Sequence, residues 1–500
     1  MPTPQPRPAG YAFLIIQHQL NVIPNWHTSL VGSTGTRSQT EQEGQVTTVY
    51  PRAQWPGDGL GAHLEFALKY DGVNLGILAA LFEVVAADEL ADWIKTKPTG
   101  KYTRKVWFLY ELLTGKQLPL PDLSVGNYLP LLEPERYYTS APGRRAPRQR
   151  ILDNLLGGRD FCPLIRRTAK LGALEDLNLR QRSAEVLTSY PPELIRRALS
   201  YLYTKETKSS FAIEHQKPSA SRTEKFIGLL QMAELKDYCV KPRLIEAQNL
   251  IVDPRFQDTD YRTSQNYVGQ SLNFQKQFVH YVSPQPDDIP ALMKGLLAAH
   301  QIMEKGAVPA VIHAAAVSYG LVFLHPFEDG NGRLHRFLVH NILHRAGVVP
   351  PGLMFPVSAA MLKNPLLYDQ SLEAFSRPLL RLVEYDLDET GRMTVSGDTG
   401  RYYRYLDMTV QAEALYEFVR LTIEQELVEE LDFLAGYDRT KQAMQEIVDM
   451  PDRLNDLFLN LCLQNHGRLS ASKRKAHFGF LTEDELARLE NAVREGFPRG

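Results

Sequence analysis

The stretch from His325 to Arg336 holds most of the residues that could do chemistry, and it reads His-Pro-Phe-Glu-Asp-Gly-Asn-Gly-Arg-Leu-His-Arg. An imidazole such as that of His325 can take up a proton near neutral pH. Asp329 offers carboxylate oxygens of the kind that Mg²⁺ uses when it bridges a protein to phosphates. Arg333 and Arg336 are three residues apart, so on a helix they share one face and can both reach a phosphate. These residues at this spacing predict a site for phosphoryl-type chemistry.

The segments on either side of this stretch must position it. An apolar run, 311–324, precedes it, and an amphipathic run, 333–345, continues from it, so we predict a helix, a tight loop and a second helix. Asp-Gly-Asn-Gly is typical of a loop that turns sharply and approaches another molecule closely. Gly330, Asn331 and Gly332 would open the second helix, whose N–H groups and positive dipole end favour an anion. The alternative to an anion site is a Gly-rich turn between two core helices, with the arginines on a solvated face.

At every fixed position, His325 to Arg336 resembles the signature of the Fic family, H-P-F-x-[D/E]-G-N-G-R-x-x-R. The resemblance implies a mainly α fold, a Fic-type helical bundle with a small β-hairpin flap. It also implies that the protein transfers AMP from ATP to a Ser, Thr or Tyr hydroxyl of a protein target. His325 would be the catalytic base and Asp329 the Mg²⁺ ligand. The ATP phosphates would meet Gly330, Asn331, Gly332, Arg333 and Arg336. Transfer of another nucleotide or of phosphate, or removal of AMP, stays open.

Residues 261–284 have the short-period, β-branched and aromatic character of a hairpin. In the Fic family, a hairpin flap lies over the active site and pairs with the backbone of the target. We therefore predict nucleotide or substrate contacts from Phe278, Val279, His280 and Tyr281. A purely structural hairpin is the alternative. In the helical stretch 366–378, Tyr368 resembles the family's aromatic contact to the nucleotide, whereas Ser376 stands where an Asn is often found.

Residues 207–216, Thr-Lys-Ser-Ser-Phe-Ala-Ile-Glu-His-Gln, resemble the inhibitory helix of many Fic proteins, S/T-x-x-x-E-G/N. Ser210 and Glu214 fit this pattern, but His215 stands where Gly or Asn is usual. The hypothesis is that the Glu214 carboxylate pairs with Arg336 and occupies the place that the γ-phosphate needs. The alternative is that Glu214 is an ordinary exposed glutamate with no inhibitory role.

A chain of 500 residues is longer than one core usually serves. We predict a mostly helical N-terminal domain at 1–200, whose first 60 residues form loops and short strands. The catalytic domain with inhibitory helix and flap is expected at 201–388, and a helical C-terminal domain, with a winged-helix-like form as one interpretation, at 389–500.

The composition favours a cytoplasmic protein. The net charge of −2 gives no overall electrostatic reason to expect nucleic acid or an anionic membrane as the partner. Cys162, Cys239 and Cys462 are far apart and odd in number, so they form neither a zinc pattern nor a disulfide framework. The apolar run 311–324 is too short to span a bilayer.

A DNA-binding regulator with a nucleotide-sensing Fic site is the alternative from another class. Its support is the seven arginines of 143–168 and the basic cluster Lys473-Arg474-Lys475. We favour a solvated face on a packed helix for the first segment, because Leu, Ile and Phe are interleaved with the arginines. Self-modification is expected, and a homodimer stays open.

Overall fold

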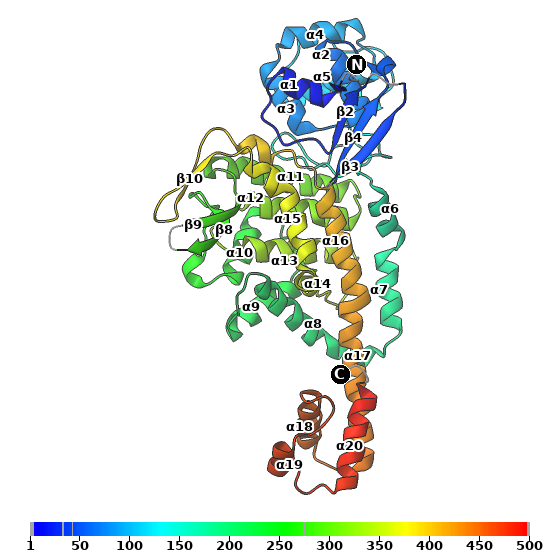
Figure 1. Cartoon of the computed structure of the whole chain (residues 1–500), viewed down its shortest axis with the longest axis vertical. Coiled ribbons are helices and arrows are strands. Elements are labelled where there is room, and N and C mark those ends of the chain that lie inside the picture. Colours follow the sequence, from blue (N-terminus) through cyan, green and yellow to red (C-terminus); the bar gives the residue numbers. More distant parts are fainter. Residues whose placement is uncertain (1–4, 33–34, 43, 274–275, 498–500) are drawn as a thin grey trace. The chain divides into compact units, whose positions relative to one another are not determined.

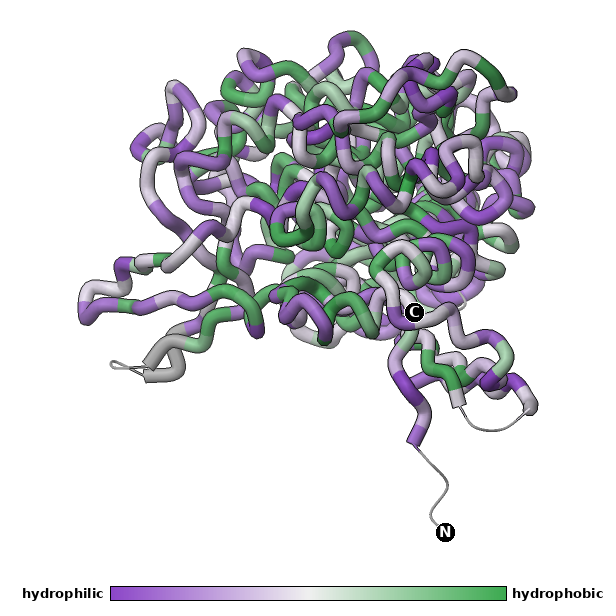
Figure 2. The backbone as a smooth tube through the Cα atoms, turned by 90° about the horizontal axis from the view of Figure 1, so that it is seen from above, coloured by the Kyte–Doolittle hydropathy of each residue, from purple (hydrophilic) through white to green (hydrophobic). Residues whose placement is uncertain are grey.

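The computed structural model describes residues 5–32, 35–42, 44–273 and 276–497, most of them in helices (Figure 1). The predicted mainly α fold is confirmed. Figure 2 shows hydrophobic and hydrophilic residues interspersed along the helical segments, as expected for helices with one face in a core. In the described part of the chain, no helix combines the length and the apolar character needed to cross a membrane.

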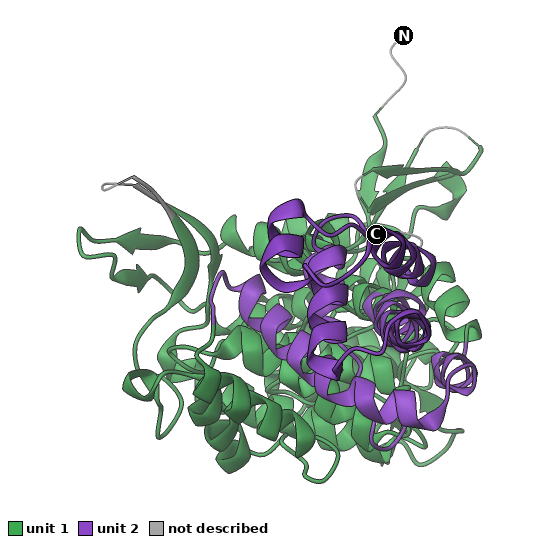
Figure 3. Ribbon diagram, turned by 90° about the horizontal axis from the view of Figure 1, so that it is seen from below, with its two compact units in different colours: residues 1–177, 218–348, 364–417 green, residues 178–217, 349–363, 418–500 purple. Residues whose placement is uncertain are grey.

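The chain divides into two compact units (Figure 3). Unit 1 comprises residues 1–177, 218–348 and 364–417, and unit 2 comprises 178–217, 349–363 and 418–500. Each unit therefore collects separate segments of the chain, which differs from the three consecutive domains that we predicted.

The first part of unit 1 joins a small sheet to a group of helices. The sheet contains β1 (Arg7–Ala9), β2 (His27–Val31), β3 (Ser38–Gln42) and β4 (Gln45–Tyr50) in the order β1-β2-β4-β3, with β2 and β4 parallel. The helices are α1 (Tyr11–Gln17), α2 (Leu60–Phe66), α3 (Leu75–Val84), α4 (Ala87–Thr96), α5 (Lys101–Thr114) and α6 (Ala169–Asp176). Leu78 and Trp107 are among the buried residues of the core that α1 to α5 share. The short strands were expected, whereas α1 was not.

The arginine-rich segment 143–168 forms strands and loops, so the interpretation as a packed helix is wrong. Strands β5 (Leu129–Pro130), β6 (Arg144–Ala146) and β7 (Ile151–Asp153) form a sheet in the order β5-β7-β6. Prolines and glycines interrupt the segment and disfavour a continuous helix. Arg144 pairs with Asp153 at 2.6 Å, and Arg148 pairs with Glu111 at 3.0 Å. Both arginines thus bind carboxylates of the same unit.

The second part of unit 1 holds the helix–loop–helix that the sequence predicted. Helix α12 (Ala310–Leu324) contacts both α11 (Ile289–Lys305) and α13 (Asn331–Arg345), and 14 of its residues are buried, from Val311 to Leu324. The predicted hairpin is also present, as β8 (Tyr267–Asn273) and β9 (Lys276–Val282). The remaining elements of unit 1 are α9 (Ala220–Gln231), α10 (Lys241–Ile251), α15 (Pro365–Leu380), β10 (Tyr385–Leu387) and β11 (Met393–Val395). Helix α16 (Thr409–Leu421) begins in unit 1.

Among its described residues, the regular elements of unit 2 are all helices. It contains α7 (Leu179–Thr188), α8 (Pro192–Ile213), α14 (Val357–Lys363), α17 (Leu427–Ile447), α18 (Asp452–Leu463), α19 (Ala471–His477) and α20 (Glu483–Gly496). Helix α8 contacts α14 and α17. The buried Glu206 of α8 accepts a hydrogen bond from the Ser358 backbone N–H at 2.8 Å, which fixes α8 to α14. The described residues after Val395 include no strand, so the wing of a winged helix is not seen among them.

Candidate active site

His325 lies at the end of α12, where its backbone has a positive φ of 49°. Its Nδ1 atom is 3.0 Å from the carbonyl oxygen of Val322. A carbonyl oxygen can only accept a hydrogen bond, so Nδ1 carries the proton and the neutral ring has its lone pair on Nε2. The local helix end therefore selects the tautomer that a general base needs.

Arg262 holds the backbone of this loop, and the sequence analysis missed it. Its Nε donates to the His325 carbonyl at 2.7 Å, and its backbone N–H donates to the Pro326 carbonyl at 2.8 Å. Its Nη2 donates to the Pro284 carbonyl at 2.6 Å, just after the flap. Burial lowers the pKa of Arg262 to about 10. A single arginine beside a predicted hairpin gave no signal that it would be buried against the motif.

The Asn331 side chain closes the loop on itself. Its Nδ2 donates to the Phe327 carbonyl at 2.7 Å, and its Oδ1 accepts from the Phe327 N–H at 3.0 Å. Both ends of this amide therefore bind backbone atoms of the loop. The Leu334 N–H bonds to the Gly330 carbonyl at 2.9 Å, so α13 starts at this turn, and the N–H groups of its first turn face the end of the helix that favours an anion.

Gly330 makes the turn into α13 with a φ of 89°. A Cβ atom at this position would lie 2.8 Å from Cγ1 of Val252. Both the left-handed backbone and this close approach therefore require glycine. The Gly-rich composition of the motif thus has a local steric cause.

Arg333 is fully buried and is fixed by two acceptors. Its Nη2 donates to Oδ1 of Asp329 at 2.8 Å, and its Nη1 donates to the Ile251 carbonyl at 3.1 Å. Oδ1 of Asp329 also accepts from the Gly330 N–H at 2.6 Å. Among the described residues, Oδ2 of Asp329 has no hydrogen bond, and 37% of the side chain is exposed. One carboxylate oxygen thus serves the fold, and the other is placed to meet a cation.

Two further carboxylates accompany Asp329. Oδ2 of Asp258 accepts from the Glu328 N–H at 3.2 Å. Burial, and then the negative charges of Glu328 and Asp329, raise the pKa of Asp258. Hard carboxylate oxygens that repel one another are the donor set that Mg²⁺ prefers, so the residues present fit this ion. Asp258 lies far from the motif in the chain, so no spacing in the sequence pointed to it.

Arg336 and Tyr368 are brought together from α13 and α15. Arg336 is 2% exposed, and its Nη1 lies 3.5 Å from the hydroxyl of the buried Tyr368. Ser376, on the same helix as Tyr368, is also buried. The structure therefore places Tyr368 beside a motif arginine, next to the region where we expected it to meet the nucleotide.

The flap residues point to two sides. Val279 and Tyr281 are buried, and the Tyr281 hydroxyl donates to the Phe323 carbonyl. The ring centroid of Tyr281 lies 6.4 Å from that of His325. Phe278 is 54% exposed, and its ring lies edge-on to that of His280 with centroids 4.8 Å apart. Tyr281 thus belongs to the surroundings of His325, whereas Phe278 faces outward.

The candidate inhibitory segment is the end of α8, in unit 2. Ser210 is buried, and Glu214 follows the last helical residue. His215 adopts a φ of 55°, the left-handed conformation that Gly and Asn adopt most easily after a helix. The departure from the family pattern at this position therefore keeps the backbone geometry of the helix end. Because Glu214 and Arg336 belong to different units, their pairing stays a prediction.

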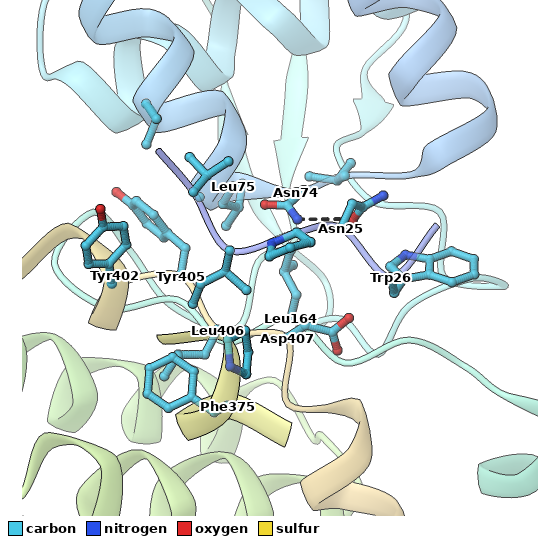
Figure 4. A pocket seen from close by; sticks show the side chains of 18 of the residues that line it. Asn25, Trp26, Asn74, Leu75, Leu164, Phe375, Tyr402, Tyr405, Leu406 and Asp407 are labelled. Carbon is cyan, nitrogen blue, oxygen red and sulfur yellow. Dashed lines mark hydrogen bonds between the residues drawn. The ribbon is translucent and has the colours of Figure 1, made fainter. Parts of the chain in front are cut away.

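A cavity of about 1290 Å³ lies elsewhere in unit 1 (Figure 4). Its lining includes Trp26, Asn74, Tyr402 and Asp407 and no residue of the motif from His325 to Arg336. The Asn74 amide donates to Oδ1 of Asn25 at 3.1 Å at its edge. The cavity is therefore separate from the phosphoryl-type site.

Comparisons with known proteins match the region around the motif. The family model described as Fic/DOC family matches residues 241–343. Part of this chain is similar to proteins named protein adenylyltransferase Fic, at 36% identity across 99 residues for that of Aedes aegypti and 37% across 102 residues for that of Culex quinquefasciatus. Each match covers 20% of this chain and only 18% of the relative.

Solved structures of Fic proteins also align with the chain. A Fic family protein from Desulfovibrio desulfuricans G20 has 18% identity and a TM-score of 0.37, covering 56% of this chain and 80% of that one. A Fic domain containing signaling protein from Bacteroides thetaiotaomicron has 18% identity and a TM-score of 0.34, covering 51% and 94%. On the motif geometry and the family match, the chain contains a domain of the Fic/DOC family at residues 241–343.

Proposed function

We propose that the protein transfers AMP from ATP to a hydroxyl group of a protein target. The observation that carries this proposal is the tautomer of His325. Its lone pair is fixed on Nε2, in the loop that leads into the anion-binding end of α13. The similarity of part of this chain to proteins named protein adenylyltransferase Fic supports the choice of AMP among the groups that such a site could transfer.

His325 acts as the general base. Its Nε2 takes the proton of a Ser, Thr or Tyr hydroxyl while the hydroxyl oxygen forms a bond to the α-phosphorus of ATP. The bond from that phosphorus to the bridging oxygen breaks, and pyrophosphate leaves. The Nδ1–H bond to Val322 keeps the ring in place when it becomes a cation. Positioned bases of this kind contribute roughly 10²–10⁴-fold to a rate.

The phosphates are bound by the start of α13 and its arginines. The N–H groups of residues 331–333 supply fixed donors that need no rearrangement during the reaction. The guanidinium of Arg333 is held by Asp329 and Ile251, so its charge is already in place. Arg336 supplies the second guanidinium, which we assign to the γ-phosphate.

Asp329 is the residue that would hold Mg²⁺, with Asp258 and Glu328 close enough to add negative charge. When bound, Mg²⁺ would neutralise the charge that develops on the departing pyrophosphate. The exposed position of Asp329 allows its second oxygen to face both the ion and the ATP.

We further propose that Glu214 inhibits the reaction by pairing with Arg336. A carboxylate on this guanidinium would take the place of the γ-phosphate and turn the α-phosphate away from in-line attack. The left-handed His215 supports this assignment, because the helix ends as it would with the family's Gly or Asn.

Two labelled forms of ATP test the proposed reaction. The purified protein is incubated with cell lysate and with ATP labelled at either the α- or the γ-phosphate, and the labelled proteins are separated. We expect label in protein only from α-labelled ATP, and none with His325→Ala. Label from γ-labelled ATP would indicate phosphate transfer and would refute the proposal. Repeating the assay with α-labelled UTP, GTP and CTP shows whether the nucleotide is AMP.

A further inference from the structure

A loop and a helix of unit 1 bring together three side chains that can bind a metal ion. Asp237 and Cys239 lie in the loop before α10, and His300 lies on α11. One ligand atom from each of the three lies within 4.8 Å of the other two. Ligand atoms of a tetrahedral zinc site are about 3.3–3.8 Å apart, given metal–ligand bonds of about 2.0–2.3 Å. The groups therefore need to move by only about 1 Å to share an ion.

His300 is oriented toward this cluster by a second histidine. Its Nδ1 lies 3.0 Å from Nε2 of His313, and both rings are buried. This contact leaves Nε2 of His300 facing Asp237, with 3.5 Å between Nε2 and Oδ1. Among the described residues, this buried Nε2 has no hydrogen bond. An unsatisfied buried nitrogen is costly, and a metal ion would satisfy it.

The surroundings offer a fourth ligand. Glu304 lies one turn after His300 on α11, with its Oε2 4.0 Å from the same Nε2. Its other oxygen is held by Arg345 at 2.5 Å. The Cys239 N–H donates to Oδ1 of Asp237 at 2.9 Å, which fixes the two loop ligands relative to each other.

We propose that Asp237, Cys239 and His300 form a structural site for Zn²⁺ or a similar divalent transition metal, with Glu304 or a water molecule as the fourth ligand. A thiolate beside an imidazole favours such an ion over Mg²⁺ or Ca²⁺, which prefer oxygen ligands alone. On binding, the Cys239 thiol loses its proton to solvent and a sulfur–metal bond forms. The sequence pattern gave no zinc signature, because the ligands come from two separate elements.

The site would fasten the loop that supports α13. Tyr238, between the two loop ligands, donates its N–H to Oδ1 of Asn341 at 3.1 Å. Its ring packs edge-on against Phe337 with centroids 4.9 Å apart. Both partners belong to α13, which carries the motif arginines. A metal ion at this site thus stabilises the helix on which the phosphate site is built, without touching ATP.

Cobalt binding tests the proposal without any use of the transfer activity. The full chain is stripped of metal with a chelator and titrated with Co²⁺ and then Zn²⁺. We expect one equivalent of Co²⁺ with a thiolate-to-cobalt charge-transfer band, loss of the band on adding Zn²⁺, and a thermal midpoint several degrees higher with metal. Cys239→Ser should abolish the band, whereas Cys462→Ser, at a buried cysteine of unit 2, should keep it.

Asp237→Asn is a second test of the site, which can be used if Cys239→Ser does not fold. Asp237 is 26% exposed, and Asn keeps a side-chain oxygen that can accept from the Cys239 N–H, so we expect the fold to be kept and the Zn²⁺ affinity to fall at least about tenfold. A folded wild-type protein that shows no thiolate band, or a band that survives in Cys239→Ser, would overturn the proposal. Loss of AMP transfer in a protein that still binds cobalt would bear only on the proposed reaction.

Discussion

Replacing Arg262 with Ala removes the donors that hold the entry of the motif. Its side chain donates to the carbonyls of His325, Ser264 and Pro284 at 2.7, 2.5 and 2.6 Å. Ser264 is exposed and its carbonyl can bind water, whereas leaving the carbonyls of the buried Pro284 and the part-buried His325 unsatisfied costs about 2–6 kcal/mol. Relief of the desolvation that lowers the pKa of Arg262 to about 10 offsets part of this cost. We therefore expect the free energy of unfolding to fall by about 2–4 kcal/mol.

The same substitution should slow AMP transfer, because the backbone that positions the His325 ring is no longer fixed. We expect kcat to fall about tenfold or more while KM for ATP changes little. Urea unfolding and transfer from α-labelled ATP measure the two effects. Arg255→Ala is the matched control, since Arg255 is in the same region, pairs with the neighbouring Asp253 and is 80% exposed. Equal stability and kcat for Arg262→Ala and Arg255→Ala would refute the role of Arg262.

His325→Ala should reduce transfer by roughly 10²–10⁴-fold while ATP binding, measured by calorimetry, stays largely intact; residual transfer within tenfold of wild type would remove His325 from catalysis. Asp329→Ala should weaken the dependence of the rate on Mg²⁺, and an unchanged Mg²⁺ titration would show that the metal assignment is wrong. Glu214→Gly should raise self-labelling and target labelling by about an order of magnitude or more. Arg336→Ala should not raise labelling, because productive binding of the γ-phosphate needs that guanidinium. Equal labelling by wild type and a stably folded Glu214→Gly would contradict the inhibitory assignment. Burial lowers the pKa of His335 to about 3, so below pH 6.5 the unfolded chain binds a proton that the folded one does not, and stability is lost as the pH falls. Between pH 7 and pH 5, this loss amounts to about 2 kcal/mol of unfolding free energy. In urea unfolding, His335→Gln should therefore lose less stability than wild type over that interval. Equal losses of stability would show that another group titrates.

Local pattern predicted the centre of this site well. The apolar run before His325 and the Gly-rich turn after it specify α12, the loop and α13 through neighbouring residues alone, and the flap hairpin follows from short-period β-branched residues. The role of the Asn331 side chain could not be read in this way. An amide at a helix start can donate to a ligand or to its own loop, and only the fold decides between them.

Contacts between segments that are far apart in the sequence could not be predicted from local sequence patterns. Arg262 and Asp258 lie more than 60 residues before the motif contacts that give them their roles, and neither belongs to a spacing that signals chemistry. The arginines of 143–168 were read as a helical face because apolar residues recur among them. These arginines instead lie in a small sheet and its loops, where carboxylates such as those of Asp153 and Glu111 bind them.

The assembly of unit 2 from three stretches of chain limits how its parts can be separated. Helix α8, which ends at the candidate inhibitory Glu214, also buries Glu206 against Ser358, and its Lys205 binds Glu426 at 2.9 Å. A truncation that removes residues 178–217 would therefore leave the Ser358 N–H without its carboxylate partner and Glu426 with Lys363 as its remaining lysine partner among the described residues, and we expect the remainder to unfold or aggregate rather than become a released enzyme. The helix proposed to regulate the enzyme is thus also needed for the folding of unit 2, so only single substitutions at its end can distinguish the two roles.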